Sequence, residues 1–215
     1  MIYVIDTETN GAKVPEVIEL GWLQLDNPEI NGRARFRPSV PSGCGALSVH
    51  HILNEELELC PPSTTAQLPE DCTAIIGHNV DYDWAALGRP TVKRICTLVI
   101  SRHISPELES HTLGAMMYAY LPPEEARKLL KNAHTAFADA YACYRLLLKL
   151  VFDPKILLDE DALWKYSESC RRPTHMPFGK HKGEPLRKVP RSYIRWLLQQ
   201  PEVDPYLMAA IKELS

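Results

Sequence analysis

Short apolar runs separated by turn-forming residues fill the first half of the chain. Strands are predicted at residues 2–6, 17–26, 32–37, 73–79 and 93–98. The first two are rich in Val, Ile, Leu and Trp, the third is followed by prolines and glycines, and the fourth is a short apolar run that stops at Gly77. Apolar runs of this length, bounded by turn residues, are typical of buried strands. The first half of the chain therefore predicts a β-sheet.

Helical spacing dominates the second half. Helices are predicted at 112–121, 123–131 and 135–152, and the last of these repeats apolar residues at helical intervals from Ala136 to Leu150. Strands come first, and helices follow and intervene. We therefore predict an α/β fold with a mixed sheet flanked by helices.

The last part of the chain predicts a small module of its own. We place one domain at 1–168 and the module at 175–215. In the module, MPFGKHKGEPL predicts a hairpin and VPRSYIRWLLQQ a helix. Asp204 followed by proline predicts the start of a last helix that runs to Leu214.

Composition narrows the class of protein. The 215 residues are 45% hydrophobic with a net charge of −3, which is typical of a soluble globular chain. No apolar run approaches the roughly 18 residues of a membrane helix, and the first residues lack the features of a signal peptide. Six cysteines without a CxxC pair argue against a zinc site and indicate a reducing compartment. We expect a cytoplasmic protein with no membrane partner.

The charge is distributed unevenly. Residues 1–169 carry 15 Lys and Arg against 23 Asp and Glu, a net −8, whereas residues 170–215 carry 9 against 4, a net +5. This asymmetry favours a polyanionic partner that meets the C-terminal end, although a solvated basic module has the same charge. The residues proposed for nucleic-acid contact there are Lys180, Lys182, Arg191 and Arg195.

Two acids end the first apolar run. Asp6 and Glu8 stand two residues apart, so in an extended chain their side chains share one face. Like charges that close repel unless a cation lies between them, and Mg²⁺ prefers oxygen ligands. A strand that runs into an acidic turn explains the same pattern, so further ligands are needed to decide.

Two later segments supply further acids. GHNVDYDW places Asp83 five residues after His78, and AHTAFADAYA places Asp139 five residues after His134. Each spacing alone occurs by chance. In the order DxE, HNxxxD and HxxxxD, however, the three segments resemble the motifs of the DEDDh 3′→5′ exonucleases. LSVHHI, RICTL and FGKHKGEPL resemble the same family, so the likeness reaches both ends of the chain.

This resemblance implies a ribonuclease-H-like fold and hydrolysis of phosphodiesters with two Mg²⁺ ions, for which Mn²⁺ can substitute. It implies that Asp6, Glu8 and Asp139 hold one ion and that Asp6 and Asp83 hold the other. Two metals about 4 Å apart activate the water and relieve charge on the phosphoryl and leaving oxygens. His134 is then the general base, a role that suits an imidazole near neutral pH.

The resemblance also implies a set of substrate contacts, which comprises Thr9, Asn10, Gly11, His50 and Asn79. Ala12 departs from the family pattern, which has a leucine there that packs against the last base. The expected partner is nucleic acid with a free 3′ end, with single-stranded DNA favoured over RNA and nucleoside 5′-monophosphates as products. Two alternatives stay open: trimming of RNA 3′ ends on the same core, and a polymerase-associated proofreading or adaptor subunit.

Overall fold

A computed structural model describes residues 1–151, 159–200 and 203–214. Five strands form one sheet in the order β3-β2-β1-β4-β5. Their bounds are Ile2–Thr9 (β1), Val17–Gln24 (β2), Asn31–Arg35 (β3), Ala74–Gly77 (β4) and Lys93–Cys96 (β5). β1 is antiparallel to β2 and parallel to β4, so the sheet is mixed. The predicted α/β class is confirmed.

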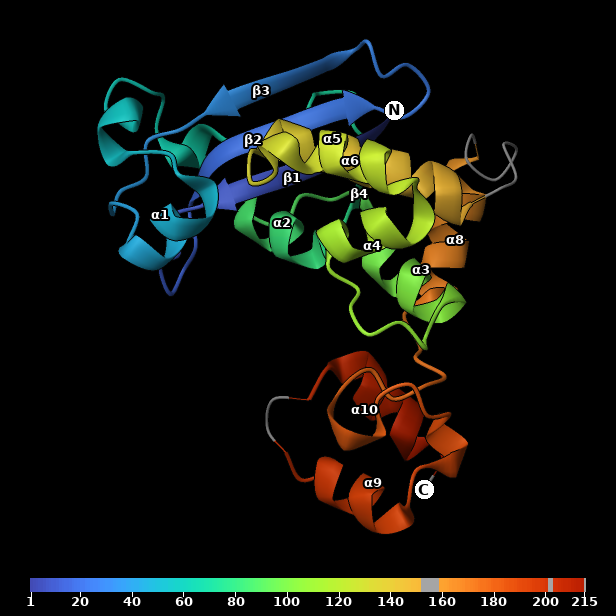
Figure 1. Ribbon diagram of the computed structural model, residues 1–215. Helices are drawn as coiled ribbons and strands as arrows, with labels where there is room; N and C mark the ends of the chain where they lie inside the picture. Colours follow the sequence, from blue (N-terminus) through green and yellow to red (C-terminus); the bar gives the residue numbers. More distant parts are fainter. Residues whose placement is uncertain (152–158, 201–202, 215) are drawn as a thin grey trace.

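Helices cover both faces of the sheet (Figure 1). Their bounds are Cys44–His50 (α1), Val80–Ala86 (α2), Thr97–Ile104 (α3), Leu113–Tyr120 (α4), Pro123–Leu129 (α5), Ala136–Leu150 (α6), Glu160–Cys170 (α8), Arg191–Leu197 (α9) and Pro205–Lys212 (α10). Short 3₁₀ turns lie at Asn54–Leu57, Ser63–Thr65, Leu130–Asn132, Gly179–His181 and Leu186–Lys188. None of the described helices is long and apolar enough to cross a bilayer.

The alternation of side chains along β1 divides the core into two clusters. Val4 joins a cluster built with α4, α6 and α8, whereas its neighbours Tyr3 and Ile5 join a cluster that contains Val80 and Trp84 of α2. Successive residues of a strand point to opposite faces, so the apolar first half of β1 contributes to both layers. β1 is therefore held from both sides where its acidic end emerges.

Several element boundaries differ from the prediction. β1 continues to Thr9, so both of its acids lie inside the strand, and the run predicted as a strand at 93–98 turns into α3 at Thr97. α2, α3 and α8 were not predicted; a short apolar run has no period that separates strand from helix. The predicted helix at 135–152 is observed as α6, and residue 152 lies outside the described residues.

The C-terminal residues build a small core of their own, which comprises Met176, Leu186, Val189, Ile194, Leu197, Leu207 and Ile211. In place of the predicted hairpin, the segment forms a loop that contains a 3₁₀ turn at Gly179–His181 and is closed by one antiparallel bridge between His175 and Pro185. Within it, Met176 N donates to Glu184 O at 2.8 Å, and Gly183 N donates to Met176 O at 2.8 Å. Gly183 adopts a φ of 79°, which favours glycine. Figure 1 shows this module beside the body, joined by the segment that follows α8. α8 extends to Cys170, and the division at 168 stays a prediction.

Candidate active site

Three carboxylates meet where β1 and the start of α6 approach each other. Asp6, Glu8 and Asp139 each offer one oxygen, and these oxygens all lie within 4.8 Å of one another. Asp6 and Glu8 share one face of β1, as the strand period requires. The spacing that suggested a pair of ligands in the sequence therefore places both beside an acid that is more than 130 residues away.

A glycine explains why Asp139 reaches the strand. Gly21 of β2 pairs with Asp6, and a Cβ built on Gly21 would lie 2.3 Å from Phe137 N and 2.4 Å from the carbonyl carbon of Ala136. These are backbone atoms of the first turn of α6, which cannot swing aside as a side chain can. The missing side chain lets α6 begin directly on the sheet, and Asp139 follows one turn later.

A buried acid that we did not predict holds the same helix terminus. Glu19 is fully buried and stands opposite Glu8 in the β1–β2 register. Its Oε2 accepts a hydrogen bond from Ala136 N at 3.0 Å, and its Oε1 accepts one from Arg35 Nε at 2.9 Å. A carboxylate at a helix N-terminus satisfies a free N–H group and complements the helix dipole. The available signal was an acid in the apolar run VIELGWLQL.

Asp83 approaches β1 from α2, the helix that follows β4. Asn79 precedes α2 with a φ of 77°, and Asp83 lies one turn into that helix and is buried. Asp83 Oδ1 accepts hydrogen bonds from Thr7 N at 2.9 Å and from Thr7 Oγ1 at 2.7 Å. Thr7 lies between Asp6 and Glu8 along β1, so these two bonds fix α2 against the strand that carries the other acids.

Burial and the proximity of other carboxylates raise the pKa values of the clustered acids. Burial, reinforced by the nearby carboxylates of Asp83, Asp139 and Glu8, raises the pKa of Asp6 well above its ordinary value. Burial and the same kind of repulsion raise the pKa of Glu8 to about 8, and burial raises that of Asp83 to about 7. Clustered hard oxygens that cannot all ionise unaided are the donor set that a divalent cation suits.

His134 stands at the edge of this cluster. It is exposed, its φ is 68°, and its backbone N donates to Asp139 Oδ2 at 3.0 Å. It lines a hollow of about 470 Å³ together with His50, His51 and Phe137. The imidazole is thus accessible and anchored through its own backbone to a carboxylate of the cluster. The role of base stays a prediction.

Two of the predicted substrate contacts, Thr9 at the end of β1 and Asn10 after it, form hydrogen bonds within the protein. Thr9 Oγ1 shares a hydrogen bond with the Tyr82 hydroxyl at 2.6 Å. Asn10 is buried; its Nδ2 donates to Val40 O at 3.0 Å, and its Oδ1 accepts from Glu16 N at 3.0 Å. These bonds shape the loop, whose next residue, Gly11, has a φ of 70°. Contact between this loop and a nucleotide stays a prediction.

His50 and Asn79 lie in hollows on different sides of the site. His50 is buried, and its Nδ1 accepts a hydrogen bond from Ile52 N at 2.9 Å. The proton is therefore on Nε2, which has no partner among the described residues. Asn79 lines a second hollow of about 410 Å³ beside α2. Only His50 shares a hollow with His134.

The four basic residues proposed in the module make different contacts. Lys180 Nζ lies 5.2 Å from the centre of the Tyr193 ring, whereas Lys182 Nζ donates to the backbone oxygen of Glu109 in the body. Arg191 and Arg195 are exposed on α9. Among the contacts of these four residues in the described part of the chain, the one to the body of the protein is that of Lys182.

The fold is one that solved 3′→5′ exonucleases share. The segments quoted above resemble exodeoxyribonuclease X in particular, and a structure of exonuclease X in complex with 5′ overhanging duplex DNA matches 78% of this chain and 99% of that chain, with 19% identity and a TM-score of 0.63. A zinc-bound complex of E. coli exonuclease I with single-stranded DNA matches 74% and 42%, with 16% identity and a TM-score of 0.57. The expected resemblance is confirmed for the fold.

Further comparisons concern RNA and the module. A 3′-exonuclease that recognises the histone mRNA stem-loop matches 71% of this chain and 82% of that chain, with 13% identity and a TM-score of 0.53. Residues 172–202 match a family described as "Putative quorum-sensing-regulated virulence factor". No curated protein matches the chain. The separate family match falls on the module and not on the acidic cluster.

Proposed function

We propose that the protein is a metal-dependent 3′→5′ exonuclease that removes nucleoside 5′-monophosphates from DNA, with single strands preferred. The observation that carries this proposal is the convergence of Asp6, Glu8 and Asp139 oxygens within 4.8 Å of one another. That convergence occurs on a fold shared by exonucleases solved with DNA. A merely solvated acidic turn would not gather acids from β1 and α6.

The acids divide into two ligand groups by position. Asp6, Glu8 and Asp139 would hold one Mg²⁺, and Asp83, fixed against β1 by Thr7, would hold a second with Asp6. When bound, two such ions activate a water molecule and stabilise the charge that develops on the phosphoryl and leaving oxygens. Mn²⁺, which accepts the same oxygen donors, is expected to substitute.

Two histidines would supply a proton acceptor and a hydrogen-bond donor beside the acids. His134 is exposed beside Asp139 and would accept the proton of the attacking water. His50 lines the same hollow with a buried Nε2–H that has no partner within the described part of the chain and would donate to an oxygen of the terminal nucleotide. A buried donor without a partner costs free energy until a ligand accepts its bond. On this proposal, the terminal nucleotide would lie in the hollow that both histidines line.

A nuclease assay tests the proposal. Single-stranded DNA, blunt duplex DNA and RNA, each labelled at the 5′ end, are incubated with the protein and Mg²⁺. We expect stepwise shortening from the 3′ end, fastest on single-stranded DNA. Asp6→Ala is expected to abolish shortening, and His134→Ala to slow it by about 10²–10⁴-fold. Asp26→Ala, which removes an exposed acid away from the cluster, is the matched control and should retain full activity.

Other outcomes would assign the site differently. Internal nicks with intact ends would indicate an endonuclease. Shortening of RNA but not DNA would favour the RNA-trimming alternative, for which the fold shared with the histone mRNA exonuclease is the supporting observation. No shortening with either Mg²⁺ or Mn²⁺ would refute the proposed activity and leave the adaptor alternative.

A further inference from the structure

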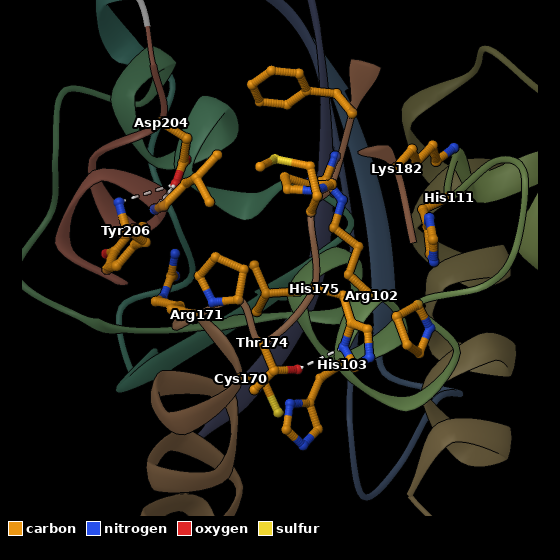
Figure 2. Close-up of a pocket in the computed structure, with 17 residues that line it drawn as sticks. Arg102, His103, His111, Cys170, Arg171, Thr174, His175, Lys182, Asp204 and Tyr206 are labelled. Atoms are coloured by element: carbon orange, nitrogen blue, oxygen red, sulfur yellow. Dashed lines mark hydrogen bonds between the residues drawn. The ribbon is translucent and has the colours of Figure 1, made fainter. Parts of the chain in front are cut away.

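A cavity of about 300 Å³ lies between the body and the C-terminal module (Figure 2). Figure 2 shows Lys182 and His111 on one side and Arg171, Asp204 and Tyr206 on the other. The hollow of about 410 Å³ beside α2 shares Arg102, His111, Pro177 and Lys182 with this cavity. Together they form a groove, named here the module groove, that runs from Asn79 at the start of α2 to the module.

Two cations of the module groove are not neutralised. Arg102 is exposed, and no hydrogen bond or ion pair of its guanidinium is found among the described residues. Lys182 is exposed and uses one N–H on the Glu109 carbonyl, which leaves two donors free. Both cations act on the ring of His111 and add to the effect of burial in lowering its pKa. Positive charge is therefore concentrated around one point of the groove.

The other charged groups of the cavity are already engaged. Arg171 pairs with Asp81 and, through Nε at 2.7 Å, with Glu168. Asp204 accepts hydrogen bonds from the backbone N–H groups of Tyr206 and Leu207, both at 3.0 Å, and so caps α10. Glu109 is the acid that lines the hollow beside α2, and it is exposed to solvent. Arg102 and Lys182 are therefore the cations of the groove that form no ion pair among the described residues, and Asp204, the acid of the cavity, lies on the side opposite Lys182 (Figure 2).

One wall of the groove is formed by the residues that directly follow β4. His78 follows β4; its Nε2 bonds to the His111 backbone oxygen at 2.7 Å, and its Nδ1 bonds to Thr97 Oγ1 at 3.0 Å. His78 and Asn79 both line the hollow beside α2, the helix that carries Asp83. Asn79 thus stands at the end of the groove nearer the acids, and a strand whose 3′ end lies among them can pass into the groove there.

We propose that the module groove binds the sugar-phosphate backbone of the single strand upstream of the 3′-terminal nucleotide, with Arg102 and Lys182 contacting phosphates. This inference rests on the proposed function, because that function places the 3′ end at the acids. Phe178, which is 41% exposed, lines the module end of the groove and offers a face for a base. An aromatic face beside free cations fits a polynucleotide better than a free phosphate.

A binding experiment tests the groove without turnover. Fluorescence anisotropy in EDTA measures the affinity of labelled oligodeoxynucleotides of about 4 and about 15 nucleotides, the longer of which has room for many phosphate contacts. The double variant Arg102→Ala/Lys182→Ala is compared with Arg187→Ala/Lys188→Ala. The second pair is exposed, belongs to the C-terminal module as Lys182 does, lies outside both hollows and removes the same charge. All four residues are on the surface, so thermal unfolding should show both variants folded.

The expected result is a loss confined to the long strand. Each phosphate contact to a single strand contributes about 0.7 to the slope of log affinity against log salt, so two lost contacts reduce the slope by about 1.4. Between about 50 and 200 mM salt, the wild type should then lose about 7-fold more affinity for the long strand than the groove variant. The control variant should keep the wild-type slope, and the short strand should not distinguish the proteins.

Three results would overturn the inference: no gain of wild-type affinity with strand length, a groove variant that binds like the control, or an equal loss on short and long strands. Competition with inorganic phosphate and with 5′-dAMP separates the sources of phosphate. If the groove variant loses binding of either small anion and shows no length effect, the cavity is a small-anion site. Failure of the nuclease assay with a preserved length effect would refute the proposed activity but not the groove.

Discussion

Replacing Gly21 by alanine tests whether the seating of α6 on the sheet assembles the candidate site. The new Cβ would lie 2.3 Å from Phe137 N and 2.4 Å from the carbonyl carbon of Ala136. Ordinary van der Waals contact begins at 3.4 Å, so the start of α6 must retreat from β2 by about 1 Å. Asp139 and His134 belong to that part of the chain and would move with it.

The size of the effect follows from this displacement. Forcing extra atoms into a packed contact costs about 1–3 kcal/mol of folding free energy, which the protein is expected to survive. A shift of about 1 Å in catalytic groups costs on the order of 10²-fold in rate. Gly21→Ala should therefore lower kcat far more than it lowers the folded fraction, and it should weaken stabilisation by Mg²⁺.

The assay combines 3′ shortening of single-stranded DNA with thermal unfolding in EDTA and in Mg²⁺. Gly45→Ala is the matched control, because Gly45 lies in α1 and a Cβ there would meet nothing within 4 Å. The control should gain about 0.5–1 kcal/mol of stability, since alanine favours a helix over glycine, and keep its rate. A Gly21→Ala protein with wild-type rate and wild-type Mg²⁺ stabilisation would refute the reasoning.

Two further predictions concern the buried acids. In EDTA, the Tm should fall as the pH rises from about 5 to about 9. The pKa values of Glu8 (about 8) and Asp83 (about 7) in the folded protein lie above those of ordinary carboxyls. The folded state therefore binds more protons than the unfolded state in this window, and its stability is lost as these carboxyls ionise. Mg²⁺ should therefore raise the Tm more at the alkaline end; a Tm independent of pH would contradict this. In Mg²⁺, Glu19→Ala should cost about 3 kcal/mol in urea unfolding, because Ala136 N and Arg35 lose a buried charged partner; an unchanged midpoint would show that the cap is dispensable.

Local pattern was sufficient for much of the sheet and for the long helices. β1 and β2 were predicted from short apolar runs, and α6 from apolar residues that repeat at helical intervals. α2 and α3 were not predicted, because their short segments adjoin apolar strands and are too short to show a helical period. β5 ends at Cys96 and α3 begins at the next residue, a boundary that the apolar run did not mark.

The sequence by itself determined the identity and spacing of the acids, since Asp6 and Glu8 share a face in any extended strand. It did not determine the contacts that bring Asp139 and Asp83 to that face. Those contacts depend on Gly21 admitting α6 and on Thr7 holding Asp83. Each joins residues far apart in the chain, and a period reports which face is apolar but not which element covers it. For the same reason, only the tertiary structure decided where the basic module meets the body.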